Sequence, residues 1–216
     1  MGVFYLMCWL RHYPQDRGTR PYRAPITLRG QCVTLLPLTL EHGEALFRAL
    51  NDDEELWRYI PVAQPQTLAE MQGWIATALE EQQQGRRLPF AVVEHASGQV
   101  IGSTSYVNMS PPNRNLDVGW TWYARAHWRT AVNTECKYLL LRYAFETLRC
   151  IRVQLRVDER NLRSQRAVER IGGVKEGALR KAQILHDGHE RHVVLYSLLD
   201  DEWPARKAWF EQTLRR

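Results

Sequence analysis

The hydrophobic positions in the first half of the chain follow strand spacing and helix spacing in turn. Residues 26–39 are rich in β-branched and aliphatic residues and predict a strand. Residues 40–50 and 67–85 carry apolar residues at helical spacing, and each stretch begins at or just after a threonine suited to an N-cap. Residues 89–123 contain three strand-like runs separated by turn residues, which predict an antiparallel meander.

The second half continues this alternation and begins with the most regular helical pattern, at residues 133–148. An alternating strand pattern over 151–158 is followed by a helix that begins near Asn161 and ends at two glycines. Two strand-like runs then flank an Asp-Gly dipeptide at 187–188, which is typical of a tight hairpin turn. Residues 200–216 predict a terminal amphipathic helix.

This order of elements predicts one α/β domain of the α+β type, with a mixed, mostly antiparallel sheet of about six to seven strands flanked by helices. A chain of 216 residues is short enough for a single hydrophobic core. We assign residues 25–216 to this domain and residues 1–24, which have no periodicity, to an N-terminal extension. The apolar run in the extension is too short for a signal peptide or a membrane span, so we expect a cytoplasmic protein with no membrane contact.

The charge balance adds a preference for anionic ligands, since the net charge is +5 and the sequence pI is about 9.2. The histidines around the predicted hairpin, at 186, 189 and 192, are interpreted as solvated side chains and not as metal ligands. The cysteines form no CxxC pair and indicate neither a zinc site nor a disulfide framework. These thiols, expected to be reduced and mostly buried, are Cys8, Cys32, Cys136 and Cys150.

Three stretches, taken with the order of elements, carry a family resemblance. They read LDVGWTWYARAHWRTAVNTEC at 116–136, VDERNLRSQRAVERIGGVKEGALRK at 157–181 and DGHERHVVLYSLLDDEW at 187–203. Residues 26–203 thereby resemble the GNAT superfamily of acyl-CoA-dependent N-acetyltransferases. Within it, they are most similar to the branch that includes the ribosomal-protein N-terminal acetyltransferases.

The resemblance implies a cofactor site at the loop before the helix predicted at 133–148. The family binds the pyrophosphate of acetyl-CoA there on backbone N–H groups, with Gln or Arg, then Gly, then Gly or Ala at fixed positions. Trp128, Ala131 and Asn133 stand at these positions, and alanine adopts left-handed backbone angles at a cost of about 1 kcal/mol. A plain helix cap is the alternative interpretation. The cofactor-binding candidates are Trp122, Tyr123, Trp128, Arg129, Thr130, Ala131, Val132, Asn133, Thr134 and Asn161.

The strand before that loop supplies a candidate general base. Asp117 matches the position of the carboxylate that often serves as the base in the family, and a surface aspartate is the alternative. Simple alternation places Leu116, Val118, Trp120 and Trp122 on one face and Asp117, Gly119, Thr121 and Tyr123 on the other.

The stretch that begins at Asp158 resembles the branch's Asp-x-x-Asn-x-x-Ser pattern. The resemblance implies that Asn161 contacts the cofactor and that Ser164 lies near the thioester sulfur. A serine hydroxyl there could donate a hydrogen bond to the departing thiolate. By structure alone, Asn161 is an equally good helix N-cap, and the two roles are compatible.

Residues 52–55 are all acidic and are followed by Trp57 and Tyr59. A run of this kind is usually a solvated helix end. In this branch, however, the segment between the first two helices borders the acceptor site. We therefore hypothesise that these carboxylates attract a cationic amine.

The function implied by the resemblance is direct transfer of the acetyl group of acetyl-CoA to an amine, without a metal and without a covalent enzyme intermediate. The acceptor is a protein amino terminus or a small-molecule amine. A CoA-binding regulatory protein without turnover is the main alternative. An RNA-binding module ranks last, because the sequence has no aromatic sheet motif and no continuous basic stripe, so we expect no direct nucleic-acid binding. The oligomeric state is left open, with a homodimer as one alternative.

Overall fold

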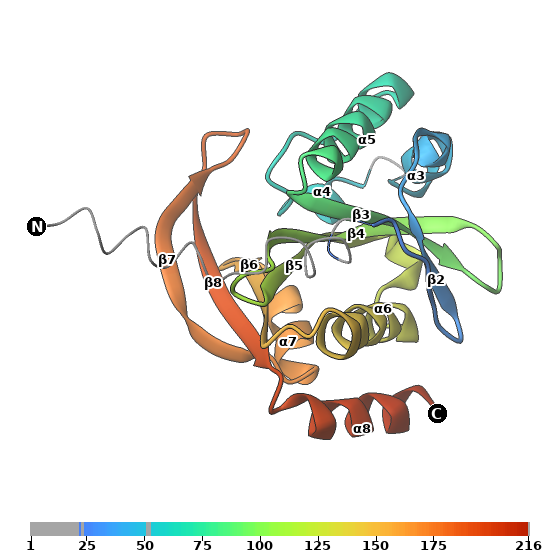
Figure 1. The fold of residues 1–216 in the computed structure, drawn as a ribbon. Helices are drawn as coiled ribbons and strands as arrows, with labels where there is room; N and C mark the ends of the chain where they lie inside the picture. The colour runs from blue at the N-terminus through green and yellow to red at the C-terminus, as the bar shows by residue number, and fades with distance from the viewer. Residues whose placement is uncertain (1–21, 23, 51–52, 216) are drawn as a thin grey trace, which may run out of the picture.

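An eight-stranded mixed sheet runs through the centre of the molecule, with helices on both faces (Figure 1). The computed structural model describes residues 22, 24–50 and 53–215, so nearly all of the predicted N-terminal extension lies outside the described residues. The strand order is β1-β2-β3-β4-β5-β6-β8-β7. Within this described part, β5 and β6 form a parallel pair and every other neighbouring pair is antiparallel.

The predicted elements of the first half are present, with two additions. The short helix α4 had not been predicted, and the first strand is divided in two. The elements are β1 (Leu28–Arg29), β2 (Val33–Pro37), a 3-10 turn (Leu40–His42), α3 (Gly43–Leu50), α4 (Glu54–Trp57), α5 (Leu68–Gln83), β3 (Arg87–Glu94), β4 (Val100–Ser110) and β5 (Asn115–Tyr123).

The second half follows the predicted order element by element. After a 3-10 turn (Arg125–His127), the elements are α6 (Ala131–Arg142), a π-helical turn (Tyr143–Thr147), β6 (Arg152–Asp158), α7 (Leu162–Arg170), β7 (Val174–Ile184), β8 (Glu190–Leu199) and α8 (Trp203–Leu214). The strands predicted to flank residues 187–188 do form an antiparallel hairpin.

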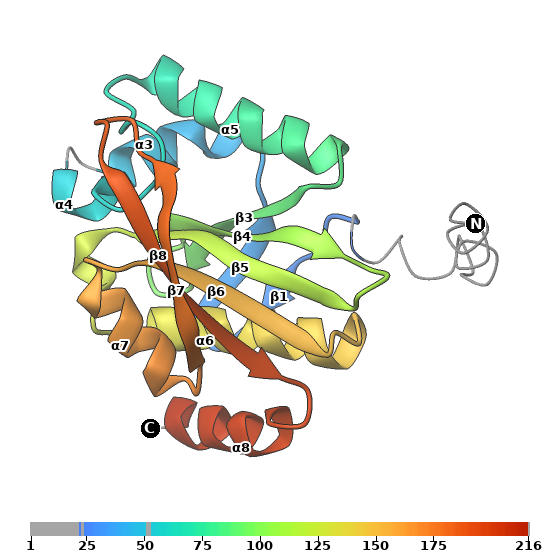
Figure 2. The same ribbon diagram turned by 90° about the vertical axis from the view of Figure 1, so that its left-hand side faces the viewer.

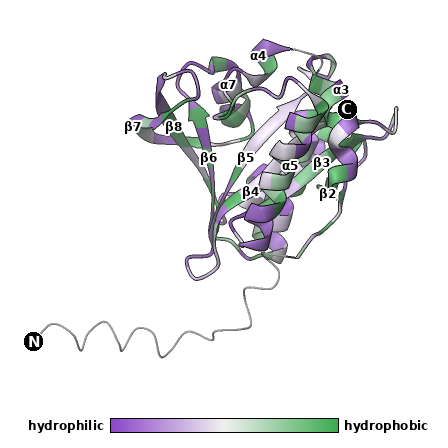
Figure 3. Cartoon of the chain, turned by 90° about the horizontal axis from the view of Figure 1, so that it is seen from above, coloured by the Kyte–Doolittle hydropathy of each residue, from purple (hydrophilic) through white to green (hydrophobic). Residues whose placement is uncertain are grey.

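Two hydrophobic cores cover the two faces of the sheet. On one face, α6 and α8 pack through residues such as Leu140 and Phe210, both fully buried. On the other face, α3, α4 and α5 pack through residues such as Leu46 and Trp57. Figure 2 shows these helix groups on opposite sides of the strands. Seen from above, α5 lies across β3 and β4 and carries both hydrophilic and hydrophobic residues on its surface (Figure 3).

The strand predicted at 26–39 is broken by a turn that α6 holds in place. The Glu135 carboxylate, only 2% exposed, accepts hydrogen bonds from the amides of Gln31 (2.6 Å), Cys32 (2.7 Å) and Val33 (2.9 Å). A Cβ on Gly30 would lie 2.5 Å from Glu135 Cδ, so any larger residue here would displace the carboxylate from the turn. The extra break raises the strand count to eight, and the rest of the predicted fold class is confirmed.

Glu135 anchors the first turns of α6 to the β1–β2 turn, and Glu135→Ala should therefore destabilise the protein by about 2 to 4 kcal/mol. Although burial opposes it, the hydrogen bonds from the turn lower the pKa of Glu135. The stabilisation is therefore present above the usual glutamate pKa and is lost as the pH falls through the lowered value. Urea unfolding midpoints measure the effect, with the exposed Glu80→Ala on α5 as the control. Equal midpoints for Glu135→Ala and wild type would contradict this account.

Candidate functional site

Strands β5 and β6 separate halfway along their length. Their parallel pairing runs from Asn115 opposite Arg152 to Val118 opposite Leu155 and stops there. We call this point the β5–β6 fork, with residues 119–123 of β5 and 156–158 of β6 as its two arms. Beyond the fork the arms do not pair with each other, so the main-chain groups that face across the fork have no sheet partner.

A β-bulge in β5 marks the fork. Ser105 pairs with Gly119 and Ser103 pairs with Trp122, so Trp120 and Thr121 together lie opposite a single residue of β4. Trp120 has a φ of 52°, in the left-handed region. A bulge bends its strand and increases the local twist. The β4 backbone also approaches β5 closely here, since a Cβ on Gly102 would lie 2.1 Å from the Trp122 carbonyl oxygen.

The bulge overturns the predicted sharing of faces along β5. Leu116 and Val118 belong to the core beneath α6, as does Tyr123. Trp122 instead lies in the other core, where its ring centroid is 5.6 Å from that of Trp57. The prediction that Trp120 and Trp122 share a face with Leu116 is therefore wrong, because the extra residue reverses the alternation.

The loop before α6 ends in a capped helix start. The Thr130 hydroxyl accepts a hydrogen bond from the Val132 amide (3.3 Å) and donates one to the His127 carbonyl (2.8 Å). The left-handed residue of this loop is Arg129, with a φ of 62°. Ala131 begins the helix, so the backbone cost expected at Ala131 does not arise. No described residue provides an acceptor for the amides of Arg129, Thr130 or Ala131.

Helix α7 begins close to the same loop. The Asn161 side chain caps it by accepting a hydrogen bond from the Ser164 amide at 3.0 Å, which confirms the predicted N-cap. In its first turn, the Arg163 guanidinium lies 3.3 Å from the centre of the Trp128 ring. Trp128 in turn donates from Nε1 to the Tyr123 carbonyl at the end of β5 (2.8 Å). One stacked pair thus links the starts of α6 and α7 to the end of β5.

Several predicted cofactor residues point their side chains into the protein. Trp122, Tyr123 and Val132 are buried in the cores. The Thr134 hydroxyl is also buried and accepts a hydrogen bond from Arg170 at 3.2 Å. The side chains of these four residues are therefore not placed to meet a ligand, while Arg129 and Ala131 are exposed and Asn133 is half-buried.

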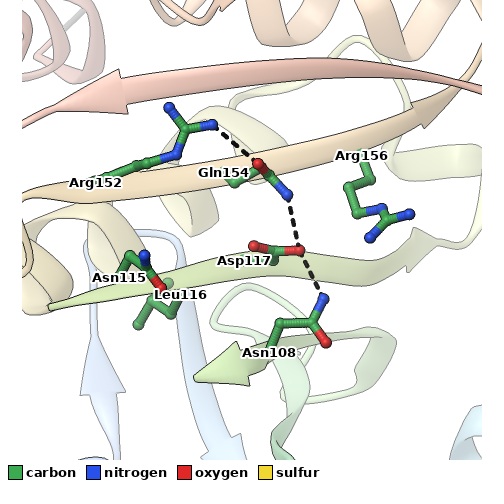
Figure 4. Close-up of a pocket in the computed structure, with 7 residues that line it drawn as sticks. All are labelled: Asn108, Asn115, Leu116, Asp117, Arg152, Gln154 and Arg156. Carbon is green, nitrogen blue, oxygen red and sulfur yellow. Dashed lines mark hydrogen bonds between the residues drawn. The ribbon is translucent and has the colours of Figure 1, made fainter. Parts of the chain in front are cut away.

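Asp117 lies at the base of the fork, beside a cavity of about 210 Å³ (Figure 4). Its carboxylate is 7% exposed and accepts hydrogen bonds from Asn108 Nδ2 (2.8 Å) and Gln154 Nε2 (3.3 Å). Arg152 and Arg156 of β6 also line the cavity. Burial raises the pKa of Asp117, and the hydrogen bonds from Asn108 and Gln154 oppose that rise. A carboxylate with a raised pKa is a stronger base than an ordinary aspartate.

The acidic segment before the second predicted helix is held by Arg125. Its guanidinium bonds both oxygens of Asp53 (2.6 and 2.8 Å) and one oxygen of Glu55 (2.8 Å). These carboxylates are therefore already paired, which weakens the hypothesis that they attract a cationic amine. Glu54 has no ion-pair partner among the described residues, and Asp52 lies outside them.

Sequence reasoning missed a buried amine near the fork. Lys137 of α6 is 6% exposed, and its Nζ donates to Thr121 Oγ1 at 2.8 Å. A charged residue inside an apolar helical pattern was the signal that could have found it. Asn108 and Gln154 were also missed, because they come from separate strands and only the sheet register brings them to Asp117.

The described residues contain no group of three or more His, Cys, Asp or Glu side chains placed to hold a metal ion. Cys32, Cys136 and Cys150 are free thiols, the last two buried, and Cys8 lies outside the described residues. No helix in the described ranges is long and apolar enough to cross a membrane.

Comparison with known proteins agrees with this geometry. A Bacillus subtilis protein named "Putative ribosomal N-acetyltransferase YdaF" is 33% identical over 110 residues, which span 51% of this chain and only 59% of that relative. A GCN5-related N-acetyltransferase from Brucella melitensis is 30% identical with a TM-score of 0.84, covering 92% of this chain and 89% of its own. Mycobacterium smegmatis RimJ, solved in complex with CoA-disulfide, is 21% identical with a TM-score of 0.74 over 89% of this chain and 94% of its own, and shares the fold.

The family assignment rests on a match to a known protein family that covers more than half of the chain. Residues 33–174 match the family described as "Acetyltransferase (GNAT) domain", and this range includes the meander, the fork, α6 and α7. The chain therefore belongs to the GNAT family of acetyltransferases.

Proposed function

We propose that this protein transfers the acetyl group of acetyl-CoA directly to a primary amine, and that the cofactor binds at the β5–β6 fork. The observation that carries the proposal is the end of pairing after Val118 and Leu155, next to the capped start of α6. The CoA-disulfide bound by the mycobacterial protein of the same fold supports a CoA site in this architecture.

The start of α6 offers a seat for the cofactor's pyrophosphate. The amides of residues 129–131 have no acceptor among the described residues, and the positive end of the helix dipole lies there. Arg129 is exposed beside them, and Arg163 lies across Trp128 from the start of α7. These groups together form a cationic site suited to a diphosphate.

The arm of β5 beyond the fork is suited to the pantetheine part of the cofactor. Residues 119–123 lack a ladder partner on the β6 side. The amide groups of pantetheine can pair with such a strand edge in the way that an added strand would. This arrangement brings the thioester toward the bulge and toward Asp117.

The reaction then needs a C–N bond formed, the C–S bond broken and two protons removed from the ammonium nitrogen. Asp117 accepts the proton of the incoming ammonium, directly or through water, and leaves a neutral amine. The amine nitrogen attacks the thioester carbonyl, the C–S bond breaks, and CoA leaves as a thiolate that takes up the second proton of the nitrogen, so the products are the amide and the CoA thiol. The Ser164 hydroxyl, in the first turn of α7, donates a hydrogen bond to that thiolate.

We favour a protein amino terminus as the acceptor over a free small amine. A related Bacillus protein carries the name of a ribosomal N-acetyltransferase. The cavity beside Asp117, about 210 Å³, is small for a complete ligand and suits the first residue of a chain that extends outside it. The alternative of a CoA-binding regulator loses its main support, because no left-handed alanine weakens the cofactor loop.

The direct test titrates acetyl-CoA against wild type and Ser164→Ala while following both binding and thiol release with a peptide amine. Wild type should bind and release thiol, and Ser164→Ala should bind equally well but release thiol about tenfold to a hundredfold more slowly. Ser97→Ala, in the β3–β4 turn, is the matched control. If wild type neither binds acetyl-CoA nor releases thiol, the proposed function fails.

Asp117→Asn should lower kcat/KM by about a hundredfold or more, because it removes the base while keeping the shape. Since burial raises the pKa of Asp117, wild-type kcat/KM should rise with pH through a value above the usual aspartate range. The ionised Asp117 carboxylate destabilises the folded state once the pH exceeds the pKa that Asp117 has in the unfolded chain. At neutral pH, Asp117→Asn should therefore have the same urea midpoint of unfolding as wild type or a higher one. The exposed Asp201→Asn serves as the control. A variant with full activity would exclude Asp117 as the base.

Ala131→Gly tests the cofactor loop. Because Ala131 has helical angles, glycine should relieve no strain and should cost up to about 1 kcal/mol of stability. Acetyl-CoA should bind the variant no more tightly than it binds wild type. Isothermal titration measures the affinity, and tighter binding to the variant would mean that the missing glycine is a handicap after all.

A further inference from the structure

Lys137 is a buried ammonium with few partners. It is one of four lysines in the chain, and the other three are exposed or half-buried. Its Nζ has three donors, but Thr121 Oγ1, at 2.8 Å, is the sole acceptor that the described residues give it. Thr121 Oγ1 is itself hydrogen-bonded to Thr104 Oγ1 at 2.8 Å. No carboxylate in the described part of the chain forms an ion pair with Lys137.

Such a residue is unfavourable for folding. Lysines are almost never fully buried unless they are paired, because the charged form loses its hydration. Burial accordingly lowers the pKa of Lys137 to about 8. An apolar side chain of similar length would fill the same space without this cost. The lysine therefore does not serve the packing of the α6 face.

The position of Lys137 places its ammonium next to the proposed cofactor site. Thr121 belongs to the arm of β5 beyond the fork, and α6 lies beneath β5 in Figure 1. Asn133 is four residues earlier in α6 and therefore lies on the same stripe, one turn closer to the helix start. Helical side chains lean toward the N-terminus, so Lys137 extends from the second turn back toward the pyrophosphate seat.

We propose that Lys137 is a cofactor-binding residue, whose ammonium donates a hydrogen bond to an oxygen atom of CoA on the α6 side of the fork. The inference rests on the proposed function and extends it to a residue inside the protein. The oxygen belongs either to the diphosphate or to an amide carbonyl of the pantetheine arm, since both are acceptors at this end of the cofactor. CoA would supply a further hydrogen-bond acceptor for the Lys137 ammonium, which has Thr121 as its sole acceptor among the described residues.

Lys137→Met separates this role from a structural one, because the two predict different results. If the ammonium binds CoA, the variant should keep or raise the unfolding midpoint and weaken acetyl-CoA binding about tenfold to a hundredfold. Lys175→Met, at an exposed lysine of β7, is the matched control and should change neither quantity. Wild-type affinity in Lys137→Met would overturn the inference, while a wild type that does not bind acetyl-CoA would instead overturn the proposed function.

Two ligand fragments identify the oxygen. ADP carries the diphosphate without pantetheine, and S-acetylpantetheine carries the amide carbonyls without phosphate. If Lys137 binds the diphosphate, Lys137→Met should weaken ADP binding and leave the use of S-acetylpantetheine as donor unchanged. If it binds a carbonyl, the pattern is reversed. If Lys137→Met responds to both fragments and to acetyl-CoA as wild type does, Lys137 makes no contact with the cofactor.

A second measurement does not require a folded variant. In wild-type protein labelled with ¹⁵N-lysine, Lys137 should give a slowly exchanging Nζ resonance, because the other three lysines are accessible to solvent. Saturating CoA should shift this resonance and slow its exchange further. A resonance that does not respond to CoA, in protein that binds CoA, would also overturn the inference.

Discussion

The bulge at Trp120 is the constraint on which the site depends. One extra residue in β5 bends the strand away from β6, and the pairing between the two ends at Val118. The same insertion turns Trp122 into the core under α4 and α5 and turns Thr121 toward Lys137. A regular strand would extend the pairing and leave no free strand edge between the two helix starts.

Charged groups lie on both faces of the sheet around the fork. On the α6 side, two helix starts, Arg129 and Arg163 make a cationic environment for an anionic cofactor. On the opposite side, the buried carboxylate of Asp117 has a raised pKa and faces a polar cavity. The arrangement matches a reaction in which a polyphosphate cofactor and an amine approach one thioester from different directions, with Asp117 as the base beside Arg152 and Arg156. Arg129 and Arg163 thus place part of the positive charge of the chain, which is +5 in total, at the proposed cofactor site.

Local patterns made much of the fold predictable from the sequence. The hairpin, the meander and the cap at Asn161 depend on turn residues and periodicity, and the structure contains all three. The break between β1 and β2 was not predictable, because it depends on Glu135 from a helix about a hundred residues away. The prediction of which β5 side chains share a face was also wrong. Side chains alternate regularly on each side of the bulge, but the extra residue moves those after it to the opposite face from the one that simple alternation predicts. For the site, the sequence indicated the cofactor loop, but it could not reveal Lys137 or the partners of Asp117, which the sheet register brings together.

Hydrogen–deuterium exchange with and without CoA tests the central claim that the cofactor binds at the fork. The account predicts slower exchange on binding in residues 119–123 of β5 and residues 129–131 before α6, with little change in α8 on the far side of α6 (Figure 2). Protection confined to other parts of the chain, in protein that binds CoA, would contradict it.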